Sequence, residues 1–448
     1  MTPPIDARRA AVSALMRIQD QRGYSNIVLD ELLENQSLPI AERAMTSRLV
    51  YGVTERRLTI DFLLNKLSST PVKQMSPAAR EILRVGVYQL LYTDGVPAFA
   101  AINECVSLTR KFGCGRLSGF VNAVLRSVQR EADRLLAELP ETDKGLEIRY
   151  SCPRAHIRAW RQAYGDETMR GLLNTINEAP PTYIRVNTCR TSAEKLTAAL
   201  SEAGVICTPV DGLPNALCLS TVQALHCLPE EIKSHFYYQD VASQWCCLSL
   251  DAQPNERIAD VCAAPGGKSM TVAQYMQNSG EIQSADLYEQ KCSVINRRAA
   301  EYGFTCIKAE QRDATQTPSD ERIGQFDRVI CDAPCSGMGV IRRKPEIRYK
   351  DPVEFAELPS LQLQILSQAA KLVRVGGVLQ YSTCTLRPEE NEQVAEAFLS
   401  QHPEFNPRLL PLETCFAQAD LPVSHQITLF PHIHGTDGFY IASFVRTR

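Results

Sequence analysis

The strongest constraint on the fold is an alternation of short apolar strands and helices that begins at Arg257. Strand and helix repeated in this order indicate a doubly wound parallel sheet, because each connection between parallel strands needs a crossover that is usually a helix. We therefore expect an α/β Rossmann-like domain in the C-terminal half, completed by a turn at Gly435 that leads into a last antiparallel strand ending near Phe444. The predicted parallel strands are Ile258–Cys262, Glu281–Asp286, Phe304–Lys308, Phe326–Asp332 and Gly377–Ser382.

The first 135 residues have a different period. Apolar residues recur three and four positions apart, which predicts an all-α domain. After a boundary around Gly145–Trp160, Thr182–Asn187 is predicted to be a strand and Ser192–Ala203 a helix, which indicates a small α/β module. The expected domains are residues 1–140, 141–236 and 237–448. The predicted helices of the first domain are Ala7–Ile18, Ile27–Leu33, Ala41–Val53, Leu58–Leu67, Ala78–Leu91, Ala100–Lys111 and Arg116–Ala132.

Composition narrows the class of protein further. The 448 residues are 44% hydrophobic and 22% charged with a net charge of -3, which is typical of a globular protein and does not by itself indicate nucleic-acid binding. The N-terminus has no apolar signal-peptide core and no apolar run reaches the roughly 20 residues of a membrane span, so we expect a cytoplasmic protein. The sixteen cysteines are scattered and no CxxC pair occurs, so reduced thiols are expected and no metal.

The loop after the first predicted strand of the sheet resembles a ligand-binding turn. Small residues in Asp260-Val-Cys-Ala-Ala-Pro-Gly-Gly-Lys-Ser let the backbone approach a ligand before a helix begins at about Ser269. A phosphate loop would need glycine at position 262, which is cysteine, and the GxGxxG order of dinucleotide sites is absent. Asp286 ends the second strand, a position at which an acidic residue accepts hydrogen bonds from ribose hydroxyls. Asp313, after the third strand, could reach the edge of an adenine ring. A ribose without a pyrophosphate fits S-adenosylmethionine.

Two cysteines follow two further strands. Cys335 lies in Asp332-Ala-Pro-Cys-Ser and Cys384 in Ser382-Thr-Cys-Thr, each just past a predicted buried strand. A thiolate is a strong carbon nucleophile near neutral pH, and carbon 5 of cytosine becomes reactive only after something adds to carbon 6. Two cysteines can share that work, although mechanism alone does not decide which of them attacks. For any cysteine the competing interpretation is a small buried hydrophobe.

These motifs, together with Pro388-Glu-Glu-Asn391, resemble those of the RNA 5-methylcytosine methyltransferases, the RsmB/NOP family. The helical N-terminal part resembles a NusB-like RNA-binding domain, and the middle resembles an RRM-like linker module. The resemblance therefore implies S-adenosylmethionine-dependent methylation of 16S ribosomal RNA, at cytosine 967 in the branch that this layout resembles. Another RNA, or a catalytically silent RNA-binding factor, is the alternative, because a fold does not prove an activity.

The resemblance also implies site residues. Cys384 is the family's nucleophile, Cys335 serves release of the adduct, and Asp332 can hydrogen-bond the pyrimidine. DNA cytosine methyltransferases instead attack from the Pro-Cys position, which would be Cys335, but their Glu-Asn-Val element is not found here. The residues expected to hold the cofactor are Cys262, Ala263, Ala264, Pro265, Gly266, Gly267, Lys268, Asp286, Asp313 and Asp332.

RNA contacts are less well marked in the sequence. Arg342, Arg343 and Lys344 follow the Asp332–Ser336 loop closely enough to contact phosphates beside the target base, although they could equally form an ordinary charged loop. Tyr237–Gln244 resembles the family's element that closes over the cofactor, although its aromatic residues could belong to a core. We expect a monomer that acts on 16S ribosomal RNA and does not bind a membrane.

Overall fold

The computed structural model describes residues 6–448 except 22–24, 35–37, 221–224, 226–227 and 413–423. The five N-terminal residues, part of the stretch assessed above for a signal peptide, thus lie outside the described residues. Contacts divide the chain into two compact units. The first comprises Met1–Glu178 and Ile341–Lys350, and the second comprises Ala179–Val340 and Asp351–Arg448.

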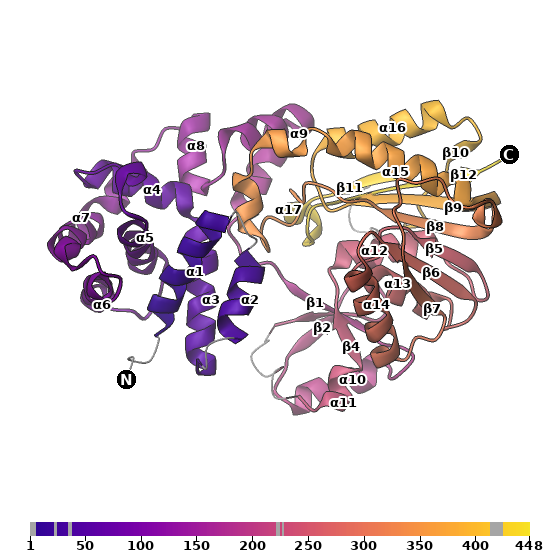
Figure 1. Ribbon diagram of the computed structural model, residues 1–448, viewed down its shortest axis with the longest axis horizontal. Helices are drawn as coiled ribbons and strands as arrows, with labels where there is room; N and C mark the ends of the chain where they lie inside the picture. The colour runs from indigo at the N-terminus through magenta and orange to yellow at the C-terminus, as the bar shows by residue number, and fades with distance from the viewer. Residues whose placement is uncertain (1–5, 22–24, 35–37, 221–224, 226–227, 413–423) are drawn as a thin grey trace. The chain divides into compact units, whose positions relative to one another are not determined.

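The first unit is helical (Figure 1). All seven helices predicted for the first domain are present, and the unit adds α8 and α9, which is interrupted at Gly165. One apolar core, formed by residues such as Leu49, Leu63 and Leu125, joins α1 to α7. The helices are α1 (Ala7–Gln21), α2 (Ser25–Glu34), α3 (Ile40–Glu55), α4 (Arg57–Leu67), α5 (Pro77–Tyr92), α6 (Ala98–Lys111), α7 (Ser118–Ala137), α8 (Asp143–Tyr150) and α9 (Arg154–Thr175).

Ile341–Lys350 joins this unit although it follows the Asp332–Ser336 loop in sequence. It contains a short 3-10 helix, Pro345–Tyr349, that packs against α3. The Arg348 guanidinium is completely buried and donates to the carbonyl oxygens of Glu55 and Ile176. The segment is therefore part of the core packing of the helical unit.

The second unit begins with a small antiparallel sheet. Its strand order is β2-β3-β1-β4, and β1 lies at its centre between β3 and β4. Two helices, α10 and α11, accompany the sheet, which confirms the small α/β module. The bounds are β1 (Thr182–Val186), α10 (Ala193–Glu202), β2 (Cys207–Pro209), β3 (Ala216–Leu219), α11 (Glu230–Lys233) and β4 (Phe236–Tyr238).

The rest of the second unit is built on an eight-stranded mixed sheet of order β10-β12-β9-β8-β5-β6-β7, with β11 paired to β12. Strands β7, β6, β5, β8 and β9 are parallel, and β12 is antiparallel to β9, which confirms the predicted Rossmann-like domain with its final antiparallel strand. The strands are β5 (Arg257–Asp260), β6 (Glu281–Asp286), β7 (Ile307–Gln311), β8 (Phe326–Asp332), β9 (Val373–Thr383), β10 (Phe405–Pro407), β11 (Gln426–Leu429) and β12 (Phe439–Arg446).

Helices cover both faces of this sheet (Figure 1). Side chains of β8 alternate between the two cores: Val329 and Cys331 pack with α15 and α16, whereas Ile330 packs with α12, α13 and α14. The helices are α12 (Val241–Leu250), α13 (Gly267–Tyr275), α14 (Glu289–Tyr302), α15 (Leu358–Leu372), α16 (Glu392–Gln401) and α17 (Pro431–His434). Within the described part of the chain, none of the helices is long and apolar enough to cross a membrane.

One predicted strand starts too early. Phe304–Lys308 was expected, but β7 begins at Ile307. The Phe304 amide donates to the Ala299 carbonyl at the end of α14, and its ring is buried in the core beside that helix. The apolar residue therefore belongs to the helix cap, where Gly303 takes the left-handed conformation, and not to the strand.

Candidate active site

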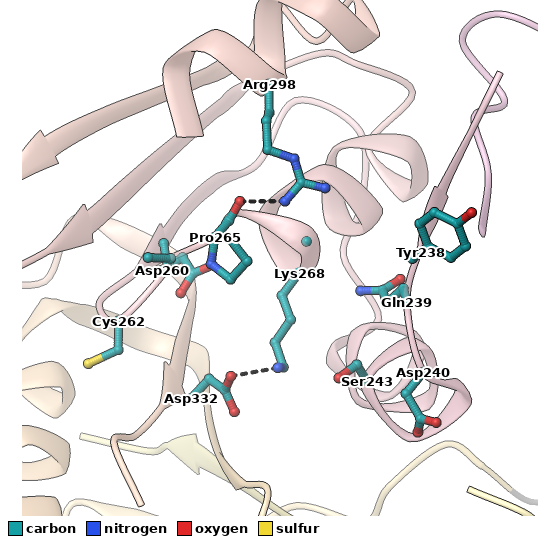
Figure 2. Close-up of a pocket in the computed structure, with 13 residues that line it drawn as sticks. Tyr238, Gln239, Asp240, Ser243, Asp260, Cys262, Pro265, Lys268, Arg298 and Asp332 are labelled. Atoms are coloured by element: carbon teal, nitrogen blue, oxygen red, sulfur yellow. Dashed lines mark hydrogen bonds and ion pairs between the residues drawn. The ribbon is translucent and has the colours of Figure 1, made fainter. Parts of the chain in front are cut away.

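The carboxyl end of β5 opens into a pocket beside the loop Cys262–Lys268 (Figure 2). Asp260 ends the strand, and α13 begins at Gly267 after a tight turn. Gly266 has φ +92, a left-handed conformation that a side chain would strain. The cavity measures about 200 Å³ and is lined by Tyr238, Gln239, Asp240, Ser243, Asp260, Cys262, Ala263, Ala264, Pro265, Gly267, Lys268, Arg298 and Asp332.

A charged pair spans this pocket. Lys268 Nζ, from the first turn of α13, donates to Asp332 Oδ2 at 2.6 Å (Figure 2), and Ser382 Oγ donates to Asp332 Oδ1 at 2.8 Å. Burial opposes the charged form of Lys268, but Asp332 outweighs burial and raises the pKa of the lysine above its ordinary value. The carboxylate of Asp332 is therefore held in place by donors from two elements, beside the loop that carries Cys335.

Asp260 lies deeper in the pocket wall. It is fully buried and accepts a hydrogen bond from Ser269 Oγ at 2.7 Å. Burial raises the pKa of Asp260 to about 7. Its Oδ1 atom makes no hydrogen bond with any described residue, and neither does Nε2 of Gln239, whose Oε1 accepts from Thr271 Oγ1.

These two orphaned polar groups test whether a polar cofactor fits the pocket. Buried polar atoms are nearly always hydrogen-bonded, so an acceptor from Asp260 and a donor from Gln239 indicate a ligand that carries both kinds of group. The amino-acid part of S-adenosylmethionine carries an ammonium and a carboxylate. The donor set therefore fits this cofactor, and the glycine turn leaves the backbone of Gly267 close to the ligand space.

The two cysteines predicted from the motifs meet at the ends of β8 and β9. Cys335 Sγ and Cys384 Sγ are 3.3 Å apart, and both side chains are partly exposed. The thiol contact with Cys384 and burial raise the pKa of Cys335 above its ordinary value. The described cysteines form no disulfide. Among the described residues, no group of three His, Cys, Asp or Glu side chains could hold a metal ion.

Asp286 and Asp313 lie at the same edge of the sheet but do not line this pocket. Asp286 ends β6 and accepts from the Tyr288 amide, with Lys291 Nζ at 3.5 Å. Asp313 follows β7 and accepts from both the amide and the hydroxyl of Thr315, bonds that lower its pKa. Their parts in cofactor binding stay predictions.

Both interpretations given for Tyr237–Gln244, a core segment and a segment that lies against the cofactor, apply to parts of it. Tyr237 is a core residue whose hydroxyl contacts Thr271, whereas Gln239 and Asp240 line the pocket. Arg298 of α14 also lines the pocket and donates to the Pro265 carbonyl at 3.0 Å. No motif marked Arg298, because it sits on a helix face whose charges look like ordinary solvated positions.

The three predicted phosphate contacts differ in exposure. Arg342 is buried, Arg343 is half-buried and Lys344 is exposed, and all three lie in the segment that packs into the helical unit. Charge in the sequence does not reveal such packing. Lys344 is therefore the most exposed member of the set, and the RNA-binding role of the set stays a prediction.

Family models match the chain in three places. Residues 5–130 match the NusB family, residues 152–226 match the ferredoxin-like domain of RsmF/B-like methyltransferases, and residues 247–445 match the 16S rRNA methyltransferase RsmB/F. Together with the pocket and the mixed sheet, these matches define an S-adenosylmethionine-dependent methyltransferase that carries a NusB-family domain.

Similarity extends over the full length of known relatives. The chain is 34% identical to the probable ribosomal RNA small subunit methyltransferase B of Bacillus subtilis (97% of this chain, 98% of the relative). It is 31% identical to the ribosomal RNA small subunit methyltransferase B of Klebsiella pneumoniae (100% of both). The chain therefore belongs to the 16S rRNA methyltransferase RsmB/F family.

Solved structures share the fold. The crystal structure of PH0851 aligns with a TM-score of 0.81 at 24% identity, covering all of both chains. NSun6 from Pyrococcus horikoshii, crystallised with SFG, aligns with a TM-score of 0.59 at 22% identity over 66% of this chain and 98% of its own. At these identities the likeness concerns the fold alone.

Proposed function

We propose that this enzyme methylates carbon 5 of a cytosine in 16S ribosomal RNA through a covalent cysteine adduct at carbon 6. One observation carries the proposal: two thiols 3.3 Å apart lie at the ends of neighbouring strands, next to the Lys268–Asp332 pair and the cofactor pocket. The RsmB/F family membership supplies the substrate class. Position 967 is the nucleotide proposed from the resemblance.

In the first step, the thiolate of Cys384 adds to carbon 6 of cytosine and a new carbon–sulfur bond forms. The electron pair of the 5,6 double bond moves onto carbon 5, which becomes nucleophilic. We assign Asp332 to accept a hydrogen bond from the cytosine amino group, and Lys268, whose Nζ lies 2.6 Å from Asp332 Oδ2, to offer positive charge to the ring as electron density builds up. When bound, S-adenosylmethionine supplies the electrophilic methyl group that carbon 5 takes.

In the second step, the adduct must break down. The thiolate form of Cys335 takes the proton from carbon 5, the 5,6 double bond re-forms, and Cys384 leaves as a thiolate, so one thiolate is consumed and one is formed. We assign this step to Cys335 because its sulfur lies 3.3 Å from the attacking sulfur. A target base must leave its stack to reach these thiols, so single-stranded or loop nucleotides are the expected substrate.

The remaining parts of the proposal concern binding and state. We propose that the cofactor is held by the Cys262–Lys268 loop with Asp286, Asp313 and Asp332. The helical NusB-family domain, residues 1–140, and Arg342, Arg343 and Lys344 are proposed to contact the RNA. One chain carries every residue named in the mechanism, so we propose a monomer, and action on ribosomal RNA implies the cytoplasm.

The test measures transfer of a labelled methyl group from S-adenosylmethionine to unmodified small-subunit RNA. We expect incorporation by the wild type, none by Cys384→Ala, and a denaturant-resistant protein–RNA adduct with Cys335→Ala. The matched control is Cys189→Ala, an exposed cysteine of the small α/β module, which should behave as wild type. Full incorporation by Cys384→Ala, or an inert wild type, would overturn the proposal; the latter would favour a silent RNA-binding factor.

The target nucleotide needs a separate measurement. Bisulfite mapping of 5-methylcytosine in 16S ribosomal RNA, with and without this gene in the cell, should show one site that disappears, at cytosine 967. Loss of a mark in another RNA would support the alternative substrate and leave the chemistry intact.

A further inference from the structure

A short turn behind the two cysteines contacts the loops that carry them both. The 3-10 helix Pro388–Glu390 and Asn391, at the start of α16, follow β9 by a few residues. Glu390 and Asn391 are both completely buried. The mechanism above uses neither side chain, yet each makes contacts next to one of the two thiols.

Glu390 supports the loop of Cys335. Its Oε2 atom accepts from the backbone amide of Ser336 at 2.8 Å and from Gln362 Nε2 at 3.0 Å, while Arg387 Nη1 lies 3.3 Å from Oε1. Removing a carboxylate from water is unfavourable unless the carboxylate is paired and hydrogen-bonded. The buried charge of Glu390 has the backbone amide of Ser336, the residue after Cys335, as its hydrogen-bond partner. Glu390 therefore holds Ser336 firmly in position.

Asn391 supports the loop of Cys384. Its Oδ1 atom accepts from Thr383 Oγ1 at 2.5 Å, and its Nδ2 atom donates to the Thr385 carbonyl at 3.0 Å. These are the residues immediately before and after Cys384. An asparagine at the start of a helix usually caps it with its side-chain oxygen, but Asn391 makes no such cap bond. Its amide serves the cysteine loop in place of the helix.

Further bonds tie the two loops to each other. Ser336 Oγ and Thr385 Oγ1 are 2.7 Å apart, and the Gly339 amide donates to the Cys384 carbonyl at 2.9 Å. The Tyr381 hydroxyl donates to the Glu390 carbonyl at 2.6 Å, which anchors the turn to β9. The two thiols, 3.3 Å apart, thus lie within a hydrogen-bond network. In this network Glu390 contacts the loop of Cys335, and Asn391 contacts the loop of Cys384.

We propose that Glu390 and Asn391 are positioning residues with separate effects: Glu390 places Cys335 for release, and Asn391 places Cys384 for attack. This inference rests on the proposed function, because it assigns each effect to the thiol that performs the step. Neither side chain needs to touch the substrate or the cofactor. Loss of each should therefore change one step of the reaction, and not the affinity for S-adenosylmethionine.

Two near-isosteric variants separate the effects. Glu390→Gln keeps the volume of the side chain but removes its charge and places an amide group against Arg387. Thr383→Val removes the hydroxyl group that donates a hydrogen bond to Asn391 Oδ1. The matched control is Glu389→Gln, in the same turn but exposed. Attack is measured as adduct formation with RNA that contains 5-fluorocytosine, because carbon 5 then has no proton to lose after methylation. Release is measured as decay of the adduct on ordinary RNA.

We expect Glu390→Gln to slow release about tenfold, with accumulation of adduct, and to leave attack within about twofold. We expect Thr383→Val to slow attack about tenfold, with no accumulation; tenfold corresponds to about 1.4 kcal/mol of activation free energy. Glu389→Gln should match wild type in both. Circular dichroism and cofactor titration show whether each variant is folded.

The outcomes separate this inference from the proposed function. If Cys335→Ala accumulates adduct but Glu390→Gln releases at the wild-type rate, the proposed function stands and the positioning role of Glu390 is wrong. If both folded variants slow attack and release by the same factor, the residues are merely structural and the division is wrong. If Cys335→Ala itself accumulates no adduct, the release role of Cys335 fails first, and with it the assignment to Glu390.

Discussion

Replacement of Arg348 by methionine tests whether Ile341–Lys350 is an integral part of the helical unit. The guanidinium is completely buried and donates to the Glu55 carbonyl (3.2 Å), the Ile176 carbonyl (3.1 Å) and Asn177 Oδ1 (2.9 Å). Methionine fills much of the same volume but donates no hydrogen bond. These three acceptors, of which the Ile176 carbonyl is buried and the other two are partly buried, would therefore lose a charged partner in Arg348→Met.

The magnitude follows from these contacts. Neutral hydrogen bonds contribute about 1 to 1.5 kcal/mol net and bonds to charged groups about 1.5 to 3 kcal/mol, so a conservative sum for three bonds is about 3 to 4.5 kcal/mol. That is a large part of the roughly 5 to 15 kcal/mol by which a domain is stable. The graded control is Tyr349→Phe, which loses the hydroxyl that bonds Ser151 Oγ and the Thr54 carbonyl, both at 2.9 Å, and should cost about 1 kcal/mol.

Amide hydrogen exchange is the suitable assay, because two compact units need not unfold together and exchange reports each helix separately. In Arg348→Met, peptides from α3 and α9 should exchange roughly 150-fold faster or more, the factor equivalent to about 3 kcal/mol. Peptides from α13, in the other unit, should keep their protection. Unchanged protection in α3 and α9 would refute the reasoning that this segment stabilises the helical unit.

Two further predictions concern the methyltransferase unit. Because burial raises the pKa of Asp260 to about 7 from an ordinary value of 3.8, the folded protein binds a proton there that the unfolded chain releases, so stability should fall as pH rises from about 4 to 7. Urea unfolding at pH 5 and pH 8 should show a smaller difference for Asp260→Asn. Gly339→Ala would set a Cβ atom 1.8 Å from the Gly438 carbonyl oxygen and 2.8 Å from that of Cys384, so we expect adduct formation to fall more than tenfold while calorimetry shows cofactor affinity retained.

The sequence predicts the local elements well because their signals are local. Apolar spacing located all seven helices of the first domain, and strand–helix alternation located the parallel sheet. What the sequence could not predict is long-range packing. The contact of Arg348 with Glu55 joins residues almost 300 positions apart, and an arginine in a charged stretch carries no mark of burial. For the same reason the sequence did not reveal that Arg342, which is expected to contact phosphates, is buried.

The same distinction between local motifs and long-range packing applies to the candidate site. Motifs located the loop around Lys268, the carboxylate Asp332 and both cysteines, because catalytic side chains follow strand ends at one edge of a parallel sheet. They did not identify Arg298. Pro388-Glu-Glu-Asn391 was among the motifs, but no role was assigned to Glu390 or Asn391, because a buried glutamate in a short turn looks like any exposed one in the sequence.

The surroundings of the two thiols also bear on the order of proton transfers. Two thiolates 3.3 Å apart would repel each other, so one sulfur keeps its proton while the other is a thiolate. The contact with Cys384, burial and the negative charges of Glu390 and Asp332 all raise the pKa of Cys335. The first of these causes ends when Cys384 is bonded to carbon 6, so we expect Cys335 to lose its proton more easily at the release step than before attack.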